Sequence, residues 1–285
     1  MAIVEVKDLT FTYRGFKKPS IRNITLSINK GDFVILTGRS GCGKTTLCRC
    51  LNGLIPHSYP GELIGEVKVA GLVVKDHPIG ELAQHVGLVL QNPENQLFSL
   101  SIERDIAFGL ENLALPREEI YKRTNWALEL IGLTDLRQKA PFELSGGQQQ
   151  RVAIASVLAM QPDVLILDEP TSFLDPLAAK KLLEIIYKLN RDLNLTIILV
   201  EHRLDLASIF SNRVLIMDQG EIKIDGPPRE VFTEEKIEQM DVGIPKVTKL
   251  YKELKKEVNN LAGITPLSSS EMVEIIKEAI NPDRG

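Results

Sequence analysis

Residues 33–46 read Phe33-Val34-Ile35-Leu36-Thr37-Gly38-Arg39-Ser40-Gly41-Cys42-Gly43-Lys44-Thr45-Thr46. The apolar beginning predicts a buried strand, and the residues from about Lys44 to Leu51 predict a helix that ends near Gly53. The glycines between strand and helix leave room for backbone N–H groups to converge on phosphate oxygens. The alternative, a glycine-rich turn beside an unrelated lysine, is disfavoured by this strand and helix on either side. The stretch therefore predicts a phosphate loop.

Each polar residue of this loop has a role in nucleotide binding. Lys44 supplies a point charge for the β- and γ-phosphates, and Thr45 supplies a hydroxyl for Mg²⁺. The helix beyond the loop aims its positive end at the same anion. The candidate nucleotide-binding residues here are Gly38, Arg39, Ser40, Gly41, Cys42, Gly43, Lys44, Thr45 and Thr46.

Composition limits the class of protein. The chain has 285 residues, of which 44% are hydrophobic and 25% charged, as in a globular protein with one large core or a core plus an appendage. The net charge of −4 lacks the basic excess that drives binding to nucleic acid, so no nucleic-acid partner is expected. The acidic start, residues 1–8, is typical of a cytosolic strand rather than a secretory signal. Apolar runs are far shorter than the ~20 residues of a membrane span, so any membrane role is expected to be peripheral.

Strand patterns surround the phosphate loop. Residues 3–6, 11–13 and 24–28 alternate between apolar and polar side chains, which predicts separate antiparallel strands. Further apolar runs predict buried strands, and helical segments mostly separate them, so we expect a parallel sheet in an α/β fold. These later strands are predicted at residues 86–90, 164–167, 196–200 and 214–217.

Two regions are predicted to be helical. Between residues 99 and 160, Ser101 caps one helix, Pro116 starts a second that Gly132 ends, and a third follows Gly147. After Gly226 apolar residues recur at helical spacing, and Ser268 to Glu271 form a capping box before a second helix of this region. Its apolar stripe comprises Val247, Leu250, Tyr251, Leu254 and Val258. The helices after Gly226 either pack on the chain's own core or form a dimerisation appendage, and the sequence leaves both open.

Several polar residues directly follow predicted strands. Asp168 and Glu169 come after the strand at 164–167, Gln91 after the strand at 86–90, and His202 after the strand at 196–200. Ligands of open α/β sheets bind at the carboxyl ends of the strands, where Lys44 also lies. Asp168 is then placed to hold Mg²⁺, and Glu169 to accept a proton near the γ-phosphate. Simple exposure at the rim of the sheet is the alternative, which the order after a phosphate loop disfavours.

A second glycine-rich segment, Leu144-Ser145-Gly146-Gly147-Gln148, opens the helix that runs to Met160. A helix start with a serine hydroxyl beside it is an anion site. The chain thus has two predicted phosphate-binding surfaces but one phosphate loop. The alternative is a glycine-rich helix cap without a ligand.

Together these motifs resemble the ATP-binding-cassette (ABC) ATPases over about residues 2–226. The resemblance implies a P-loop NTPase (RecA-like) core with an N-terminal antiparallel β subdomain, a helical insert at about 99–160 and a C-terminal helical extension at 227–285. It implies ATP and Mg²⁺ as cofactors. Phe173 and Arg203 depart mildly from the pattern, where the family commonly has alanine and aspartate.

The resemblance also assigns roles to single residues. Glu169 is the implied general base, and His202 holds the γ-phosphate and the attacking water. Thr45, Gln91 and Asp168 are the implied Mg²⁺ contacts. Tyr13 corresponds to the aromatic residue that stacks on adenine, although a half-buried strand tyrosine is a common alternative. Two cassettes lie head to tail in this family, as a homodimer or with a paralogue. The phosphates of one then meet the signature residues of the other, Ser145, Gly146, Gly147 and Gln148.

A closer resemblance lies in residues 91–98, Gln-Asn-Pro-Glu-Asn-Gln-Leu-Phe, and 105–112, Asp-Ile-Ala-Phe-Gly-Leu-Glu-Asn. These segments are similar to the ATPases of energy-coupling-factor importers, which take up vitamins or transition-metal ions. The resemblance implies a peripheral subunit at the cytoplasmic face of the cell membrane. Its implied partners are a membrane scaffold subunit and a substrate-binding membrane protein.

Two other functions are compatible with an ABC cassette. A soluble ABC ATPase acting on nucleic acid or ribosomes usually has two fused cassettes or a long inserted coiled coil, and neither is seen here. A catalytically silent ATP-binding regulator would lack the intact Glu169, His202 and signature that this chain has. Both ATP binding and hydrolysis are therefore expected.

Overall fold

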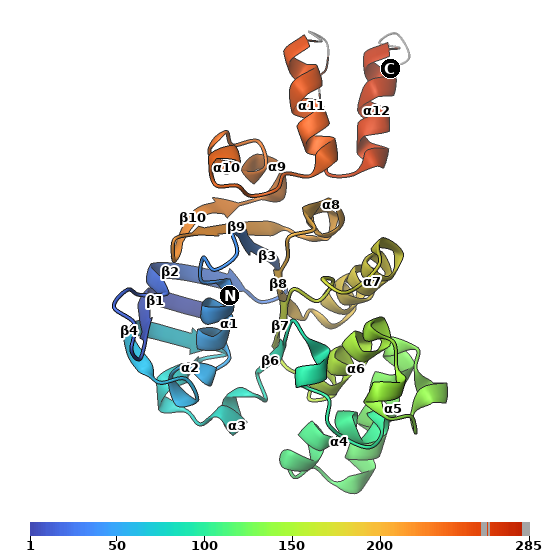
Figure 1. Ribbon diagram of the computed structural model, residues 1–285. Helices are drawn as coiled ribbons and strands as arrows, with labels where there is room; N and C mark the ends of the chain where they lie inside the picture. Colours follow the sequence, from blue (N-terminus) through green and yellow to red (C-terminus); the bar gives the residue numbers. More distant parts are fainter. Residues whose placement is uncertain (258–260, 262, 281–285) are drawn as a thin grey trace.

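The computed structural model contains two sheets with helices around them (Figure 1). It describes residues 1–257, 261 and 263–280. Val258 of the predicted apolar stripe and residues 281–285 of the predicted extension lie outside the described residues. None of the described helices has both the length and the apolar character that a membrane span requires.

The larger sheet has six strands in the order β10-β9-β3-β8-β7-β6. Five of them run parallel, while β10 pairs antiparallel with β9 at the edge. The predicted parallel sheet is thus correct for these five strands, and β10 is an addition. Its strands are β3 (Phe33–Gly38), β6 (Val86–Val89), β7 (Val164–Asp168), β8 (Thr196–Val200), β9 (Arg213–Asp218) and β10 (Glu221–Gly226). Every residue of β3, β7 and β8 is buried, which explains their apolar sequences.

The smaller sheet is antiparallel, in the order β2-β1-β4-β5. It consists of β1 (Ala2–Tyr13), β2 (Ile21–Asn29), β4 (Gly61–Val69) and β5 (Leu72–Val73). The first two were expected, but β1 is one continuous strand with a register shift near Asp8, whose φ is 47°. The pair β4–β5 was not predicted.

Helix α1 (Lys44–Leu51) lies between the two sheets (Figure 1). Its buried Leu47 and Leu51 share one apolar core with Val4 and Val6 of the small sheet and Val34 of the large one. The other face of the large sheet is covered by α7 (Pro176–Leu193) and the helical insert, which form a second core. The phosphate loop therefore begins a helix that is held from both sides.

The helical insert comprises α4 (Ile102–Asn112), α5 (Arg117–Ile131) and α6 (Gly146–Leu158). The expected helix ends are all present. The side chain of Ser101 accepts a hydrogen bond from the Arg104 N–H, Pro116 precedes α5, and Gly132 ends it with a left-handed φ of 64°.

Short helical segments connect the larger elements. They are α2 (Leu54–His57), α3 (Ile79–Leu82) and α8 (Leu204–Ala207), with 3₁₀ turns at Val74–Asp76, Pro93–Asn95, Thr134–Leu136, Pro141–Glu143 and Ser208–Phe210.

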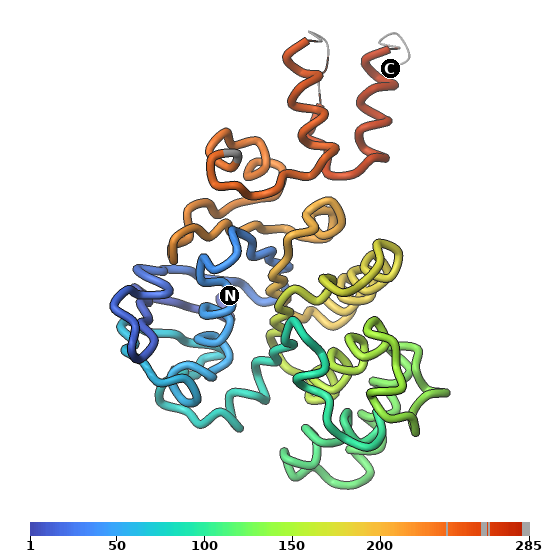
Figure 2. The backbone as a smooth tube through the Cα atoms, viewed as in Figure 1, coloured from blue at the N-terminus to red at the C-terminus, as the bar shows by residue number. Residues whose placement is uncertain are grey.

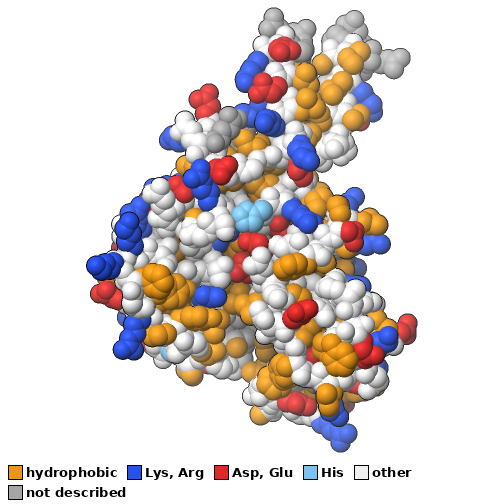
Figure 3. All heavy atoms as spheres, viewed as in Figure 1, with side chains coloured by type: hydrophobic (Ala, Val, Ile, Leu, Met, Phe, Trp, Pro, Cys, Tyr) orange, Lys and Arg blue, Asp and Glu red, His pale blue; other side chains and the backbone are white. Residues whose placement is uncertain are grey.

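We use "C-terminal extension" for residues 227–280. It contains α9 (Pro228–Val231), α10 (Lys236–Gln239), α11 (Lys246–Glu257) and α12 (Ser269–Ile280). Figure 2 shows α11 and α12 side by side, at the opposite end of the molecule from the helical insert. Apolar side chains line the sides on which these helices meet (Figure 3). The division of the chain at residue 226, the last residue of β10, stays a prediction.

The predicted capping box of α12 is modified. The Ser268 hydroxyl accepts from the N–H of Glu271 at 3.2 Å, as expected. The Glu271 carboxylate, however, accepts from the N–H of Leu267 rather than from that of Ser268, and it also pairs with Arg229. Glu271 therefore caps the helix and also attaches it to α9.

Candidate functional site

The phosphate loop needs glycine at two positions in particular. Gly38 has a φ of 148°, and a Cβ there would lie 2.1 Å from the Met217 carbonyl oxygen. Gly43 has a φ of 112°, and a Cβ there would lie 2.7 Å from the carbonyl oxygen of Ser20. Any side chain at either position would push the loop off β9 or off the segment before β2. The loop is thus held in shape by backbone on both sides.

Lys44 lies beneath this loop and is 5% exposed. Its ammonium group donates to the carbonyl oxygens of Gly38 at 2.9 Å and of Arg39 at 3.0 Å. Among the described residues, no carboxylate forms an ion pair with it. Its charge is therefore oriented by the loop but not neutralised, which suits it to an anionic ligand.

Thr45 and Asp168 meet at the carboxyl end of β7. The Thr45 hydroxyl donates to Asp168 Oδ2 at 2.8 Å. Burial raises the pKa of the Asp168 carboxyl; the hydrogen bond from Thr45 opposes this shift, and the neighbouring Glu169 adds to it. A hydroxyl and a carboxylate oxygen are ligands that fit Mg²⁺, which takes its other ligands from water and phosphate. In the described part of the chain, no group of three or more His, Cys, Asp or Glu side chains is placed to hold a metal ion.

Three side chains hold the carboxylate of Glu169. Gln91 Nε2 donates to Oε2 at 2.9 Å, and the Ser172 hydroxyl donates to the same oxygen at 3.1 Å. His202 Nε2 lies 3.2 Å from the other oxygen, Oε1. The backbone of Glu169 has a φ of 50°, which turns the chain sharply as it leaves β7. The predicted convergence of Gln91, Glu169 and His202 at one edge of the sheet is thus present in the structure.

A hollow of about 500 Å³ adjoins these groups. The phosphate loop and α1 form one wall, Gln91 and Glu169 another, and Pro19, Ser20, Gln219 and Gly220 complete the lining. The Tyr13 hydroxyl lies 3.3 Å from Thr46 Oγ1 and accepts from Arg49 Nη1 at 3.2 Å, so the ring is held against α1 beside the hollow. Its contact with adenine stays a prediction.

Glu201 is a residue of the site that sequence reasoning missed. It is 2% exposed, and its Oε2 accepts from the backbone N–H groups of His202 at 2.8 Å and Arg203 at 2.9 Å. Its other oxygen accepts from the Thr171 hydroxyl. Glu201 therefore fixes the turn that carries His202. The sequence did offer one signal for this residue: an acidic residue between the end of a predicted strand and a histidine.

The signature residues line a separate hollow of about 590 Å³. Ser145 caps α6: its hydroxyl accepts from the N–H of Gln148, whose side chain accepts from the N–H of Ser145 at 2.9 Å. Phe173, Leu174 and Asp175 line the same hollow, and no residue is shared with the hollow of the phosphate loop. Within one chain, the two predicted phosphate-binding surfaces are therefore apart.

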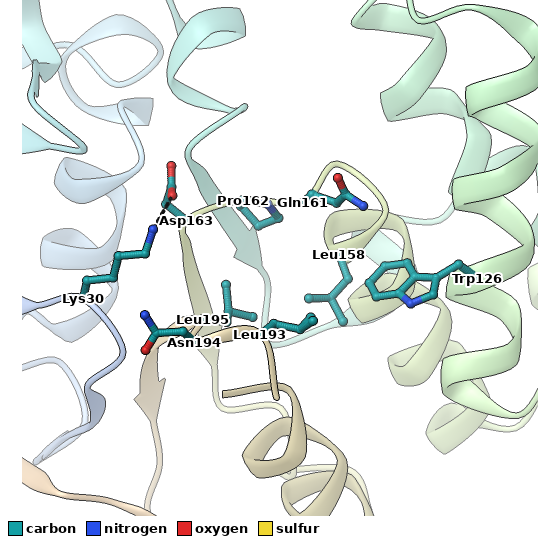
Figure 4. Close-up of a pocket in the computed structure, with 9 residues that line it drawn as sticks. All are labelled: Lys30, Trp126, Leu158, Gln161, Pro162, Asp163, Leu193, Asn194 and Leu195. Atoms are coloured by element: carbon teal, nitrogen blue, oxygen red, sulfur yellow. Dashed lines mark hydrogen bonds and ion pairs between the residues drawn. The ribbon is translucent and has the colours of Figure 1, made fainter. Parts of the chain in front are cut away.

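The opposite end of the sheet carries a different cavity (Figure 4). Asp163 and Leu195, which directly precede β7 and β8, line it together with Trp126 and Leu158 of the helical insert, and Lys30 pairs with Asp163 there. No predicted nucleotide-binding or catalytic residue lines this cavity. The candidate residues thus gather where the parallel strands end.

Comparison with protein families matches residues 21–172 to the family described as ABC transporter. The chain belongs to the ABC transporter family. It is 45% identical to a protein of Pyrococcus horikoshii named as an ABC transporter ATP-binding protein, over 98% of both chains. It is 43% identical to the energy-coupling factor transporter ATP-binding protein EcfA2 of Clostridium tetani, over 91% of both chains.

Solved structures agree with this family. The structure of cbiO1 from Clostridium perfringens, part of the ABC transporter complex cbiONQ, matches with a TM-score of 0.74 and 34% identity over 88% of this chain and 99% of that one. A dimeric cassette, MJ0796 in a post-hydrolysis state with ADP and Pi, matches with a TM-score of 0.69 and 30% identity over 79% and 98%. The predicted P-loop NTPase fold is confirmed, and this ABC cassette binds and hydrolyses ATP.

Asp168 offers a test of the site in the absence of nucleotide. Because burial raises its pKa, the folded state favours the protonated carboxyl over the ionised one. The stability that this preference contributes is present below the unfolded-state pKa and is lost as pH rises through the folded-state pKa. Asp168→Asn is therefore expected to raise the melting temperature of the nucleotide-free cassette at pH 7 by a few degrees, and to lower Mg²⁺-dependent ATP binding. Thermal unfolding at pH 4 and pH 7 checks the sign, since the gain should shrink at pH 4. An equal gain at both pH values would contradict it.

Proposed function

We propose that this cassette is the ATP-hydrolysing subunit of an energy-coupling-factor-type importer, which powers uptake of a vitamin or a transition-metal ion. The observation that carries the proposal is the connection from Glu169 through Gln91 to an exposed aromatic pair, one ring just before the helical insert and one on α4. The similarity to EcfA2 and to cbiO1 supports the same transporter class.

The catalytic half of the proposal rests on Glu169. The half-buried carboxylate, held by Gln91, Ser172 and His202, accepts a proton from the attacking water. His202 positions the γ-phosphate and this water, and Lys44 and the loop N–H groups hold the β- and γ-phosphates. Asp168, Thr45 and Gln91 would hold Mg²⁺, which supplies positive charge against the phosphate oxygens. Tyr13 provides the surface for adenine.

The second half of the site comes from a second cassette. The hollow with Ser145 to Gln148 has no phosphate loop of its own, and Gly146 and Gly147 add no side chain to the first turn of α6. We infer a head-to-tail pair, a homodimer or a heterodimer with a paralogue, in which each signature covers ATP on the other chain. The pair closes around ATP and opens after hydrolysis, and this cycle drives transport. The exposed Leu250, Val273 and Ile280 of α11 and α12 suit a further contact between the two chains.

The aromatic pair is Phe98 and Phe108, whose ring centres lie 4.8 Å apart at 87°. Both are exposed, at 65% and 44%, beside Leu100 at 75%. Gln96 holds the segment that precedes Phe98 against the end of β6. Its side chain accepts from the Leu90 N–H and donates to the Leu88 carbonyl oxygen. The pair is thus anchored near Gln91, which contacts Glu169. We propose that a helix of a membrane scaffold subunit docks here, which places the cassette peripherally at the cytoplasmic face of the membrane, next to a substrate-binding membrane protein.

The docking site is tested by Phe98→Ser, with Phe16→Ser as the control. Phe16 is a 72% exposed phenylalanine in the turn after β1, away from the helical insert. Phe98→Ser is expected to reduce the share of the cassette that co-purifies with membranes by about tenfold, the size of effect typical of a buried aromatic anchor. Phe16→Ser should leave this share unchanged. A wild-type chain that fractionates without membrane proteins would contradict the importer and favour the soluble alternative, which salt-dependent binding to nucleic acid would then support.

A further inference from the structure

The C-terminal extension contacts the phosphate loop directly. Arg39, the second residue of that loop, donates from Nε to the carbonyl oxygen of Met240 at 3.0 Å. The same nitrogen lies 3.7 Å from Asp241 Oδ2. Met240 and Asp241 follow α10, and Met240 lies 201 residues beyond Arg39. A part of the chain outside the cassette motifs is therefore joined to the loop that binds phosphate.

A polar hollow of about 410 Å³ lies at this contact. Thr37 of β3 and residues 38–40 of the phosphate loop line one side of it, and residues 241–243 of the extension line another. His202 also lines it, and its Nε2 contacts Glu169. The extension thus borders the nucleotide site between the phosphate loop and the histidine.

The extension makes a second contact on the histidine side. The backbone N–H of Lys246, the first residue of α11, donates to Asp205 Oδ1 at 2.6 Å. Asp205 lies in α8, three residues after His202. Between the two contacts, Val242 is buried in the main core. Residues 240–246 therefore bridge the phosphate loop and the segment that carries His202.

Within the extension, α12 is attached to α9. Arg229 of α9 donates to both carboxylate oxygens of Glu271 in α12, at 2.8 and 2.9 Å, and to the carbonyl oxygen of Thr265. Together with the Lys246 contact, this fixes where α11 and α12 sit. A displacement of these two helices would therefore be transmitted to residues 240–246.

The contact of Arg39 with Met240 and Asp241 contributes little to the stability of the fold. The Arg39 and Asp241 side chains are 52% and 82% exposed, and exposed ion pairs add little to stability. A merely structural role therefore predicts that loss of Arg39 leaves catalysis unchanged. A coupling role predicts a change in how the loop binds ATP.

We propose that Arg39 is a positioning residue that couples the C-terminal extension to the phosphate loop, so that the seating of α11 and α12 sets the KM for ATP. The inference rests on the proposed head-to-tail pair, in which α11 and α12 meet a second copy of this chain. Coupling between sites is reciprocal, so ATP binding in turn changes the affinity of the extension for that second copy.

A double-mutant cycle on the purified full-length chain tests the coupling. Arg39→Gln and Asp205→Ala each break one end of the bridge, and each is expected to raise the KM for ATP by about two- to tenfold with little change in kcat. The double variant should be no worse than the more affected single variant, because either change alone disconnects the extension. Arg39→Lys, which keeps a donor, should recover most of the wild-type KM.

Controls separate coupling from local damage. Arg123→Gln removes an arginine that pairs with Glu119 on α5, away from the extension, and should leave the KM unchanged. Thermal unfolding should give midpoints close to wild type for the Arg39 and Asp205 variants, as expected for exposed side chains. Effects that multiply in the double variant, or no change in KM for either single variant, would overturn the proposal. No membrane partner enters this assay, so a failure of the docking test would leave its result intact.

Discussion

Replacing Glu169 by glutamine is expected to lower the kcat for ATP hydrolysis by about 10²–10⁴-fold while ATP binding persists. Glutamine has the same size and still accepts a hydrogen bond from Gln91 or Ser172 through its amide oxygen, so the local geometry should be kept. It cannot accept a proton from water at neutral pH. The phosphate loop, with Lys44 donating to its carbonyls, is untouched. ATP should therefore stay bound and hold the closed pair together.

Two measurements check this expectation. Steady-state hydrolysis gives kcat, and size-exclusion chromatography with ATP and Mg²⁺ shows whether the paired form accumulates. Glu184→Gln is the matched control, because this glutamate of α7 is exposed and its ion pair with Lys180 is long, at 3.9 Å. It should behave as wild type. Unchanged hydrolysis in Glu169→Gln would refute the role of Glu169 as base.

The large sheet could be predicted because burial on both faces leaves an unbroken apolar run, as in residues 164–167. The strands that were missed lack this signal. In β4, Gly65 has a φ of 91°, and a Cβ there would lie 2.4 Å from the Lys7 carbonyl oxygen, so a bulge interrupts the alternation. In β10 only Ile224 is buried, since an edge strand needs few apolar residues.

The same contrast holds in the site. Gln91, Glu169 and His202 could be brought together from sequence because parallel strands end at one edge. The contact between Arg39 and Met240 could not be predicted, since it joins a side chain to a distant backbone carbonyl that carries no residue-specific signal. The role of Glu201 in fixing His202 likewise depends on where its buried carboxylate turns.

Two variants that are each inactive are expected to restore hydrolysis when mixed. Lys44→Ala removes the ammonium group that faces phosphate and leaves the Gly38 and Arg39 carbonyls without their donor, so ATP affinity should fall at least about tenfold. Ser145→Arg removes the cap of α6 and fills the start of that helix with a large side chain. In a pair made of either variant alone, both nucleotide sites are damaged.

In a mixed pair the two defects fall on the same site. The phosphate loop of the Ser145→Arg chain then faces the intact signature of the Lys44→Ala chain, and this second site is complete. An equal mixture should recover about a quarter of wild-type turnover, since half of the pairs are mixed and each keeps one site of two. Mixing Lys44→Ala with Glu169→Gln is the control: both residues belong to the phosphate-loop half, so no pair contains a complete site. Recovery in both mixtures would contradict a site shared between chains, whereas recovery in neither would assign the partner signature to a paralogue.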